Sequence, residues 1–128
     1  MHFLVILSLA TFSLAYQVTS PASGTSWSCL GPNTMTWTRA PTDPPTFAVV
    51  LVNDKYGTAD FCAWGVDGSL NQTAMSPPYG RGQFIPGDGY HLNVVRDTDH
   101  YNAILAQSNL FSISQCETLL SSAEASEP

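Results

Sequence analysis

FAVVLVN, residues Phe47–Asn53, is the strongest indication of the fold in this sequence. Three of its residues are β-branched valines, which favour a strand over a helix. Alternate residues of a strand point to opposite faces, and here both sets are apolar: Phe47, Val49 and Leu51 on one face, Ala48, Val50 and Val52 on the other. Both faces need cover, so the stretch predicts a strand inside a sheet, beginning after the prolines at 41, 44 and 45.

Shorter strand patterns surround this stretch. Thr34–Thr38 alternates between apolar and threonine positions, and Tyr90–Arg96 alternates with Leu92 and Val94 inward. We expect further strands at Phe61–Val66, Leu70–Met75 and Ala103–Ser114, the last being one strand or a bent pair, and a loop at Asp54–Asp60. With no helical period in the mature chain, the pattern predicts an all-β protein, an immunoglobulin-like or fibronectin-like β-sandwich of about seven strands.

One tyrosine supports the sandwich. Tyr90 precedes the inward Leu92 by two residues, at the entry to the penultimate expected strand. This is the spacing of a tyrosine corner, in which the phenol hydroxyl bonds to nearby backbone. An ordinary half-buried tyrosine fits the same spacing.

Composition limits the partners. The 128 residues suffice for one domain, and the 44% hydrophobic content supports a core. Ten acidic residues against four basic ones give a net charge of −6, which disfavours nucleic acid and anionic lipid as partners. A neutral polysaccharide is compatible with this charge.

The two ends differ from the middle of the chain. Residues 1–15 have the apolar centre and the small residues of a secretory signal peptide, with cleavage expected before Tyr16; an uncleaved anchor is the alternative, but the apolar run is short. Residues 16–116 are expected to form the domain, and 117–128 an acidic disordered tail. The tail carries no apolar lipid-anchor signal, so we expect a secreted, extracellular protein without a membrane anchor.

No set of residues predicts catalysis, a cofactor or a metal. His91 falls on the outward face of its expected strand, and Asp97, Asp99 and His100 form a polar turn that is more typical of a solvated loop than of a metal site. Nucleotide-binding and nucleophile-elbow motifs are missing. We expect a protein that is not an enzyme.

Aromatic residues in loops are the candidates for binding, because the flat faces of sugars stack on aromatic rings. Trp64, Tyr56 and Tyr79 lie in or beside expected loops and form the candidate glycan or partner surface. Trp37 and Trp27 are interpreted as packing residues. Partial burial of the loop aromatics as anchors is the alternative.

Asn71 begins the sequon Asn71-Gln72-Thr73, which predicts N-glycosylation in a secreted protein.

Three cysteines allow one disulfide and one free thiol, in three possible pairings. In an immunoglobulin-like sandwich, the second half of the first strand runs parallel to the last strand. Cys29 ends the former and Cys116 follows the latter, so we predict the bridge Cys29–Cys116, with Cys62 free and buried beside Phe61 and Trp64. Three separate thiols are the alternative.

Five segments occur in a recognisable order: VTSP with GTSW (18–27), NTMTWT (33–38), FAVVLVN (47–53), GDGYHLNVV (87–95) and AQSNLFSI (106–113). Together they resemble the KNH-type N-terminal domain of fungal cell-wall proteins, over about residues 17–114. No single motif is specific to that family, whereas the order is.

The resemblance implies a secreted immunoglobulin-like module without catalytic residues, related to proteins of β-1,6-glucan and cell-wall assembly. Many relatives carry a Ser/Thr-rich stalk and a lipid anchor after this domain, and the glucan-assembly members carry a second domain; neither feature is expected here. The resulting hypothesis is a non-enzymatic cell-wall or matrix module that binds wall β-glucan or wall proteins. A secreted protein-interaction module or effector without glucan binding is the alternative.

Overall fold

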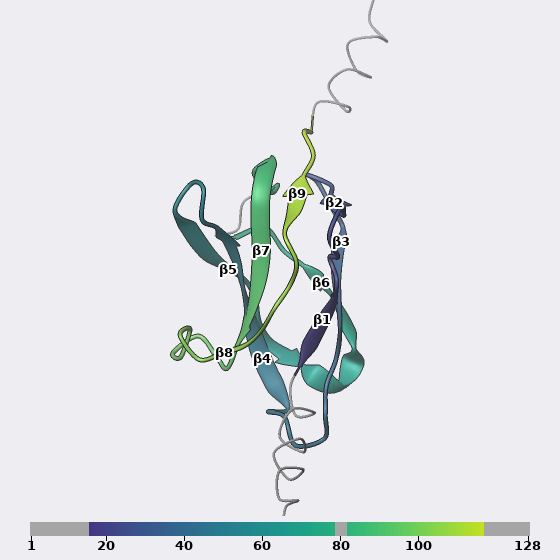
Figure 1. Cartoon of the computed structure of the whole chain (residues 1–128), viewed down its shortest axis with the longest axis vertical. Coiled ribbons are helices and arrows are strands. Elements are labelled where there is room, and N and C mark those ends of the chain that lie inside the picture. The colour runs from purple at the N-terminus through teal and green to yellow at the C-terminus, as the bar shows by residue number, and fades with distance from the viewer. Residues whose placement is uncertain (1–15, 79–81, 117–128) are drawn as a thin grey trace, which may run out of the picture.

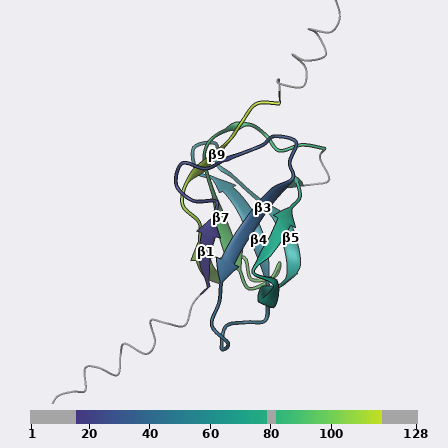
Figure 2. The ribbon, with the colours of Figure 1, turned by 90° about the vertical axis from the view of Figure 1, so that its right-hand side faces the viewer.

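The computed structural model describes residues 16–78 and 82–116. In these ranges nine β-strands form two sheets that pack face to face, and Figure 2 shows β3 lying in front of β4 and β7 (Figures 1 and 2). The strands are β1 (Gln17–Ser20), β2 (Ser26–Trp27), β3 (Asn33–Thr38), β4 (Thr46–Asn53), β5 (Thr58–Asp67), β6 (Gln72–Met75), β7 (Gly87–Val95), β8 (Ile104–Gln107) and β9 (Phe111–Ile113). The all-β sandwich predicted from the sequence is confirmed.

The FAVVLVN stretch lies inside the larger sheet, as predicted. The strand order is β2-β9-β7-β4-β5, with β8 also beside β7, and the smaller sheet has the order β1-β3-β6. β4 pairs antiparallel with both β5 and β7. Its inward residues Phe47, Val49 and Leu51 join the main core between the sheets. Its outward residues form a second cluster with Val95 and Phe61 on the outer face of the larger sheet.

The strand number of about seven was too low, because both ends of the domain are divided. Pro21 has no backbone N–H and separates β1, in the smaller sheet, from β2, in the larger one. Near the other end, the Ser108 N–H donates to the Leu92 carbonyl, and the Ser108 hydroxyl accepts from the Leu92 N–H. These two hydrogen bonds interrupt the backbone ladder with β7 at the point between β8 and β9. Ala103–Ser114 therefore forms a bent pair of strands, which was one of the two predicted alternatives.

Two element boundaries also differ from the expectations. The predicted loop Asp54–Asp60 is only a turn, since β5 already begins at Thr58. An edge strand can be polar, so the polar sequence there was misleading. The expected strand Leu70–Met75 begins at Gln72, after the short 3-10 helix η2 (Gly68–Leu70). No helix within the described ranges is long and apolar enough to cross a membrane.

Asn53 builds the tight turn between β4 and β5. Its side chain is fully buried, and Oδ1 accepts from the backbone N–H groups of Lys55 (3.0 Å) and Tyr56 (3.3 Å). Its Nδ2 donates to the Asp88 carbonyl at 2.9 Å, which fastens the turn to the start of β7. Gly57 takes a φ of +70°, a conformation that glycine adopts without a steric cost.

Tyr90 makes the tyrosine corner that the sequence suggested. Its ring is buried against the core, and its hydroxyl donates to the Ile85 carbonyl at 2.7 Å. The bond joins the start of β7 to the preceding segment, which forms one wall of the site described below.

A disulfide joins Cys29 to Cys116, whose Cα atoms are 5.3 Å apart. This is the pairing expected from the sequence, and its structural basis is the expected one, because β2 and β9 pair in parallel just before the two cysteines. The Cys29 carbonyl also accepts from the Phe84 N–H at 2.8 Å. The bridge and this hydrogen bond together hold three separate segments at one end of the sandwich.

Candidate functional site

The structure separates the tryptophans into core and surface residues. Trp27 and Trp37 are buried in the core, as expected. Trp64 is 68% exposed and Tyr56 is 55% exposed, so these two candidate residues are surface aromatics rather than buried anchors. Tyr79, the third candidate, lies outside the described residues.

Trp64 is exposed because β5 is irregular. The pairing of β4 with β5 shifts twice, and each shift leaves one extra residue on β5: Cys62 between the pairs Val49–Ala63 and Val50–Phe61, and one more beside Trp64 and Gly65. Gly65 has a φ of +60°, as bulges commonly require. Bulges of this kind turn a side chain away from the alternation of the strand, and they concentrate at sheet edges and functional sites.

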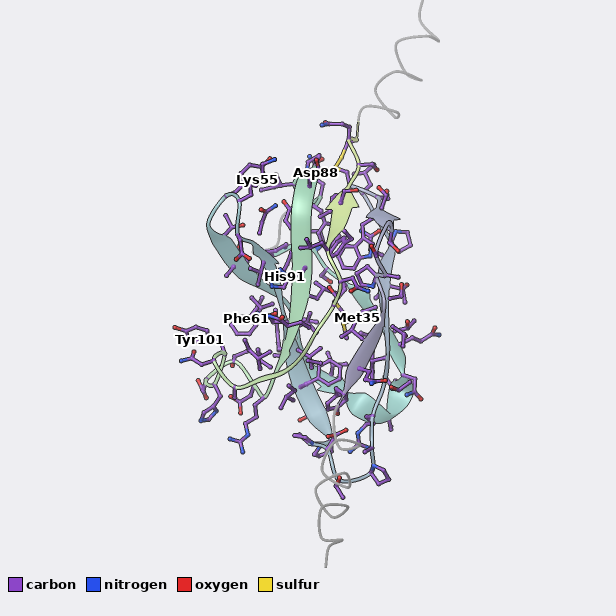
Figure 3. All side chains as sticks on the ribbon, in the orientation of Figure 1. Met35, Lys55, Phe61, Asp88, His91 and Tyr101 are labelled. Atoms are coloured by element: carbon purple, nitrogen blue, oxygen red, sulfur yellow. A yellow bond between two sulfur atoms is a disulfide. The ribbon has the colours of Figure 1, made fainter. Side chains whose placement is uncertain are left out.

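A second exposed aromatic residue lies near this bulged strand. Tyr101 sits on the connection between β7 and β8, which projects from the same side of the sandwich as Phe61 (Figure 3). It is 65% exposed. Its signal in the sequence is an aromatic residue within a polar turn, but nothing in the sequence alone connects that turn with β5.

Trp64 and Tyr101 line the same hollow, which has a volume of about 690 Å³. Its apolar floor comes from the outer face of the larger sheet, with Val50 and the half-buried Phe61. The remaining lining residues are Ala59, Asp60, Cys62, Ser76 and Pro77. An apolar hollow with exposed rings and a few polar groups has the general character of a binding site for a small or chain-like ligand.

The hollow's lining does not have the arrangement of a hydrolytic site. Glycoside hydrolysis requires two carboxyl groups at a defined separation, and Asp60 is the single carboxylate among the described lining residues. Over residues 16–78 and 82–116, no three His, Cys, Asp or Glu side chains are grouped so that they could hold a metal ion. What this arrangement offers a ligand is stacking and hydrogen bonding.

Cys62 lies under the hollow and takes no part in a disulfide. It is only 3% exposed, and its Sγ lies 3.7 Å from Sδ of Met75. Its carbonyl accepts from the Ser76 N–H at 3.2 Å, a bond that joins the two sheets at this point. Burial raises the pKa of the Cys62 thiol to about 12.

We expect native Cys62 to resist alkylation by iodoacetamide at mildly alkaline pH. Its pKa of about 12 instead of 9.0 lowers the thiolate fraction about a thousandfold, and the thiolate is the nucleophile. Mass spectrometry should find one added group only after the unreduced chain is unfolded in guanidinium chloride. Rapid labelling of the folded chain would show instead that solvent reaches the Cys62 thiol.

Asn71 is exposed and adopts a left-handed conformation with a φ of 66° at the end of η2. Its Nδ2 donates to the Trp37 carbonyl at 3.2 Å. Its exposure is compatible with the predicted N-glycosylation, which stays a prediction.

The comparison with protein families matches residues 20–113 to the Kre9/KNH-like N-terminal Ig-like domain. The chain belongs to this family. A curated relative of the Kre9/KNH-like chain is the UPF0619 GPI-anchored membrane protein C1322.10 of Schizosaccharomyces pombe (strain 972 / ATCC 24843). It is 28% identical over 131 residues, which cover 96% of this chain and 47% of the relative. The chain thus spans about half the length of that relative. No solved structure matches this chain.

The Kre9/KNH-like family and the anchored fungal relative indicate a function related to the fungal cell wall. They also indicate an extracellular or cell-wall location. The signal peptide expected at residues 1–15 and the tail expected at 117–128 both lie outside the described residues.

Proposed function

We propose that this Kre9/KNH-like chain is a non-enzymatic module of the fungal cell wall or matrix that binds wall β-glucan through the hollow formed by Trp64, Tyr101 and Phe61. The observation that carries the proposal is the pair of exposed aromatic rings around one apolar hollow, in a member of a cell-wall family. Monomeric proteins rarely expose such residues together without a binding function.

The chemistry of the lining supports a neutral sugar polymer. Exposed rings present flat faces on which sugars stack, while Asp60 and Ser76 supply hydrogen-bonding groups at the side. None of the described lining residues carries a positive charge, so the hollow has nothing with which to neutralise a polyanion. A single carboxylate in the lining supports binding rather than hydrolysis.

Co-sedimentation with insoluble β-glucan tests the proposal. We expect wild-type protein to sediment and Trp64→Ala to bind at least about tenfold more weakly, since a central aromatic residue often dominates binding energy. Leu110→Ala is the matched control, because Leu110 is 62% exposed and lines a different hollow, beside β9. Equal losses for Trp64→Ala and Leu110→Ala, or no sedimentation of the wild type, would contradict glucan binding at this hollow.

A secreted protein-interaction module is the second candidate. Exposed aromatic residues with a polar rim are also typical of protein interfaces. Retention of the wild type by extracted wall proteins, without retention by glucan, would favour this candidate.

A further inference from the structure

The hollow that holds Trp64 adjoins two others along the free edge of β5. One of them, of about 220 Å³, is lined by Tyr56, Thr58 and Asp60, and it shares Asp60 with the central hollow. Another, of about 270 Å³, is lined by β5 from Cys62 to Val66 and shares Cys62, Trp64 and Ser76 with the central one. The three hollows follow one another along β5 and share lining residues, and together we call them the β5 groove.

The β5 groove follows the open side of the sandwich. β5 is the last strand of the larger sheet, so no strand of the described ranges lies beside its outer edge. The facing wall comes from Thr73 and Ala74 of β6 and from the segment after β6, which contributes Ser76, Pro77, Pro78, Gln83 and Ile85. At about 3.3 Å per residue, the stretch from Thr58 to Val66 is about 25 Å long. This length suits a chain-like ligand better than a single small molecule.

Both aromatic and polar side chains line the groove. Tyr56 stands at one end, Trp64 lies beyond the middle, and the Asp60 carboxylate lies between them. Thr58, Gln83 and Thr73 add hydroxyl and amide groups along the walls. The described lining of all three hollows lacks a basic side chain. A polymer with flat apolar faces, many hydroxyls and no charge complements this lining.

An extended peptide is a worse fit than a sugar chain. A peptide binds a free sheet edge by continuing the ladder of backbone hydrogen bonds, which needs regular spacing along the edge strand. The two bulges of β5, at Cys62 and beside Gly65, interrupt that spacing in the middle of the groove. Bulges are one of the means by which proteins prevent strand pairing at an edge. A sugar chain needs rings and hydrogen-bonding groups but no ladder.

We propose that the β5 groove holds an internal stretch of a linear, neutral glucan chain, with Trp64 and Tyr56 as two separate stacking positions and Asp60 as a hydrogen-bond acceptor between them. This rests on the glucan binding proposed above and extends it to a binding mode in which several consecutive sugar units are held. Tyr56 then contributes only when the bound chain is long enough to reach it from Trp64.

Titration calorimetry with glucan oligosaccharides of increasing length tests the groove. For the wild type, affinity should rise with length until the groove is filled. Tyr56→Ala should bind the shortest oligosaccharides as the wild type does and bind long ones about tenfold more weakly. Trp64→Ala should weaken binding at every length, and Leu110→Ala at none. Tyr56→Ala should still fold, because the turn is held by hydrogen bonds from the backbone N–H groups of Lys55 and Tyr56 to the Asn53 side chain, and the substitution leaves these groups in place.

The possible outcomes separate the two proposals. If affinity does not change with oligosaccharide length and Tyr56→Ala binds long chains as the wild type does, binding of an extended chain along the β5 groove is rejected. Glucan binding at Trp64 would then still stand. If no oligosaccharide binds at any length, glucan binding itself is overturned. Binding of extended peptides in place of glucan would identify β5 as a strand-pairing edge and overturn both.

Discussion

Removing the Cys29–Cys116 disulfide should lower the free energy of unfolding by about 4 kcal/mol. The bridge spans 87 residues of sequence, so it encloses most of the domain in one covalent loop. In the chain-entropy description, a loop of this length restricts the unfolded chain strongly and the folded chain hardly at all. For a domain of this size, the loss corresponds to a fall in Tm of roughly 15–30 °C.

Guanidinium unfolding of the wild type beside Cys29→Ala/Cys116→Ala measures the effect. The midpoint should fall, and the m-value should not decrease, since the unbridged chain exposes at least as much surface when it unfolds. Wild-type protein treated with a reductant serves as a control that changes no side-chain volume. An unchanged midpoint in both the variant and the reduced protein would show that the bridge does not constrain the chain.

The central strand was predictable because its signal is local. FAVVLVN is apolar at every position up to Val52, and the structure places its alternate residues in two clusters on opposite faces of the larger sheet. The alternation of Met35 and Trp37 identified β3 in the same way. Where burial alone decides the position of a residue, the hydrophobic pattern records it.

The site was only partly predictable, because its geometry depends on pairing between distant segments. Sequence reasoning identified Trp64 and Tyr56 as surface candidates, and both are exposed. It did not identify Tyr101, which lies in the connection between β7 and β8 and reaches the hollow only because that connection folds beside β5. Nor did it find the bulges of β5, since an extra residue becomes visible only against the register of β4.

The predicted number of strands, about seven instead of the observed nine, was too low for a related physical reason. Whether an extended segment continues in one sheet or passes to the other is decided by its partners, and the pattern of β1 and β2 does not specify them. The polar start of β5 was misread because an edge strand that is open to solvent needs fewer apolar residues than an inner one.

Trp37→Ala should be the most destabilising single substitution among those considered, with a loss of about 3–5 kcal/mol. The Trp37 ring is 2% exposed and packs against Phe47 with ring centroids 5.0 Å apart. Its Nε1 donates to the Gly68 carbonyl at 2.8 Å, and that carbonyl belongs to η2, between β5 and β6. Alanine would leave a large cavity between the sheets and a buried carbonyl without its donor.

Two further substitutions separate the parts of this effect in the same denaturation assay. Trp37→Phe keeps an aromatic ring but removes the indole N–H, so it should cost less, about 1–3 kcal/mol. Trp64→Ala is the matched control, because the same residue type is replaced at a position that is 68% exposed, and its stability should stay within about 0.5 kcal/mol of the wild type. If Trp64→Ala lost as much stability as Trp37→Ala, Trp64 would be a packing residue, and its effect on glucan binding would no longer report on a surface site.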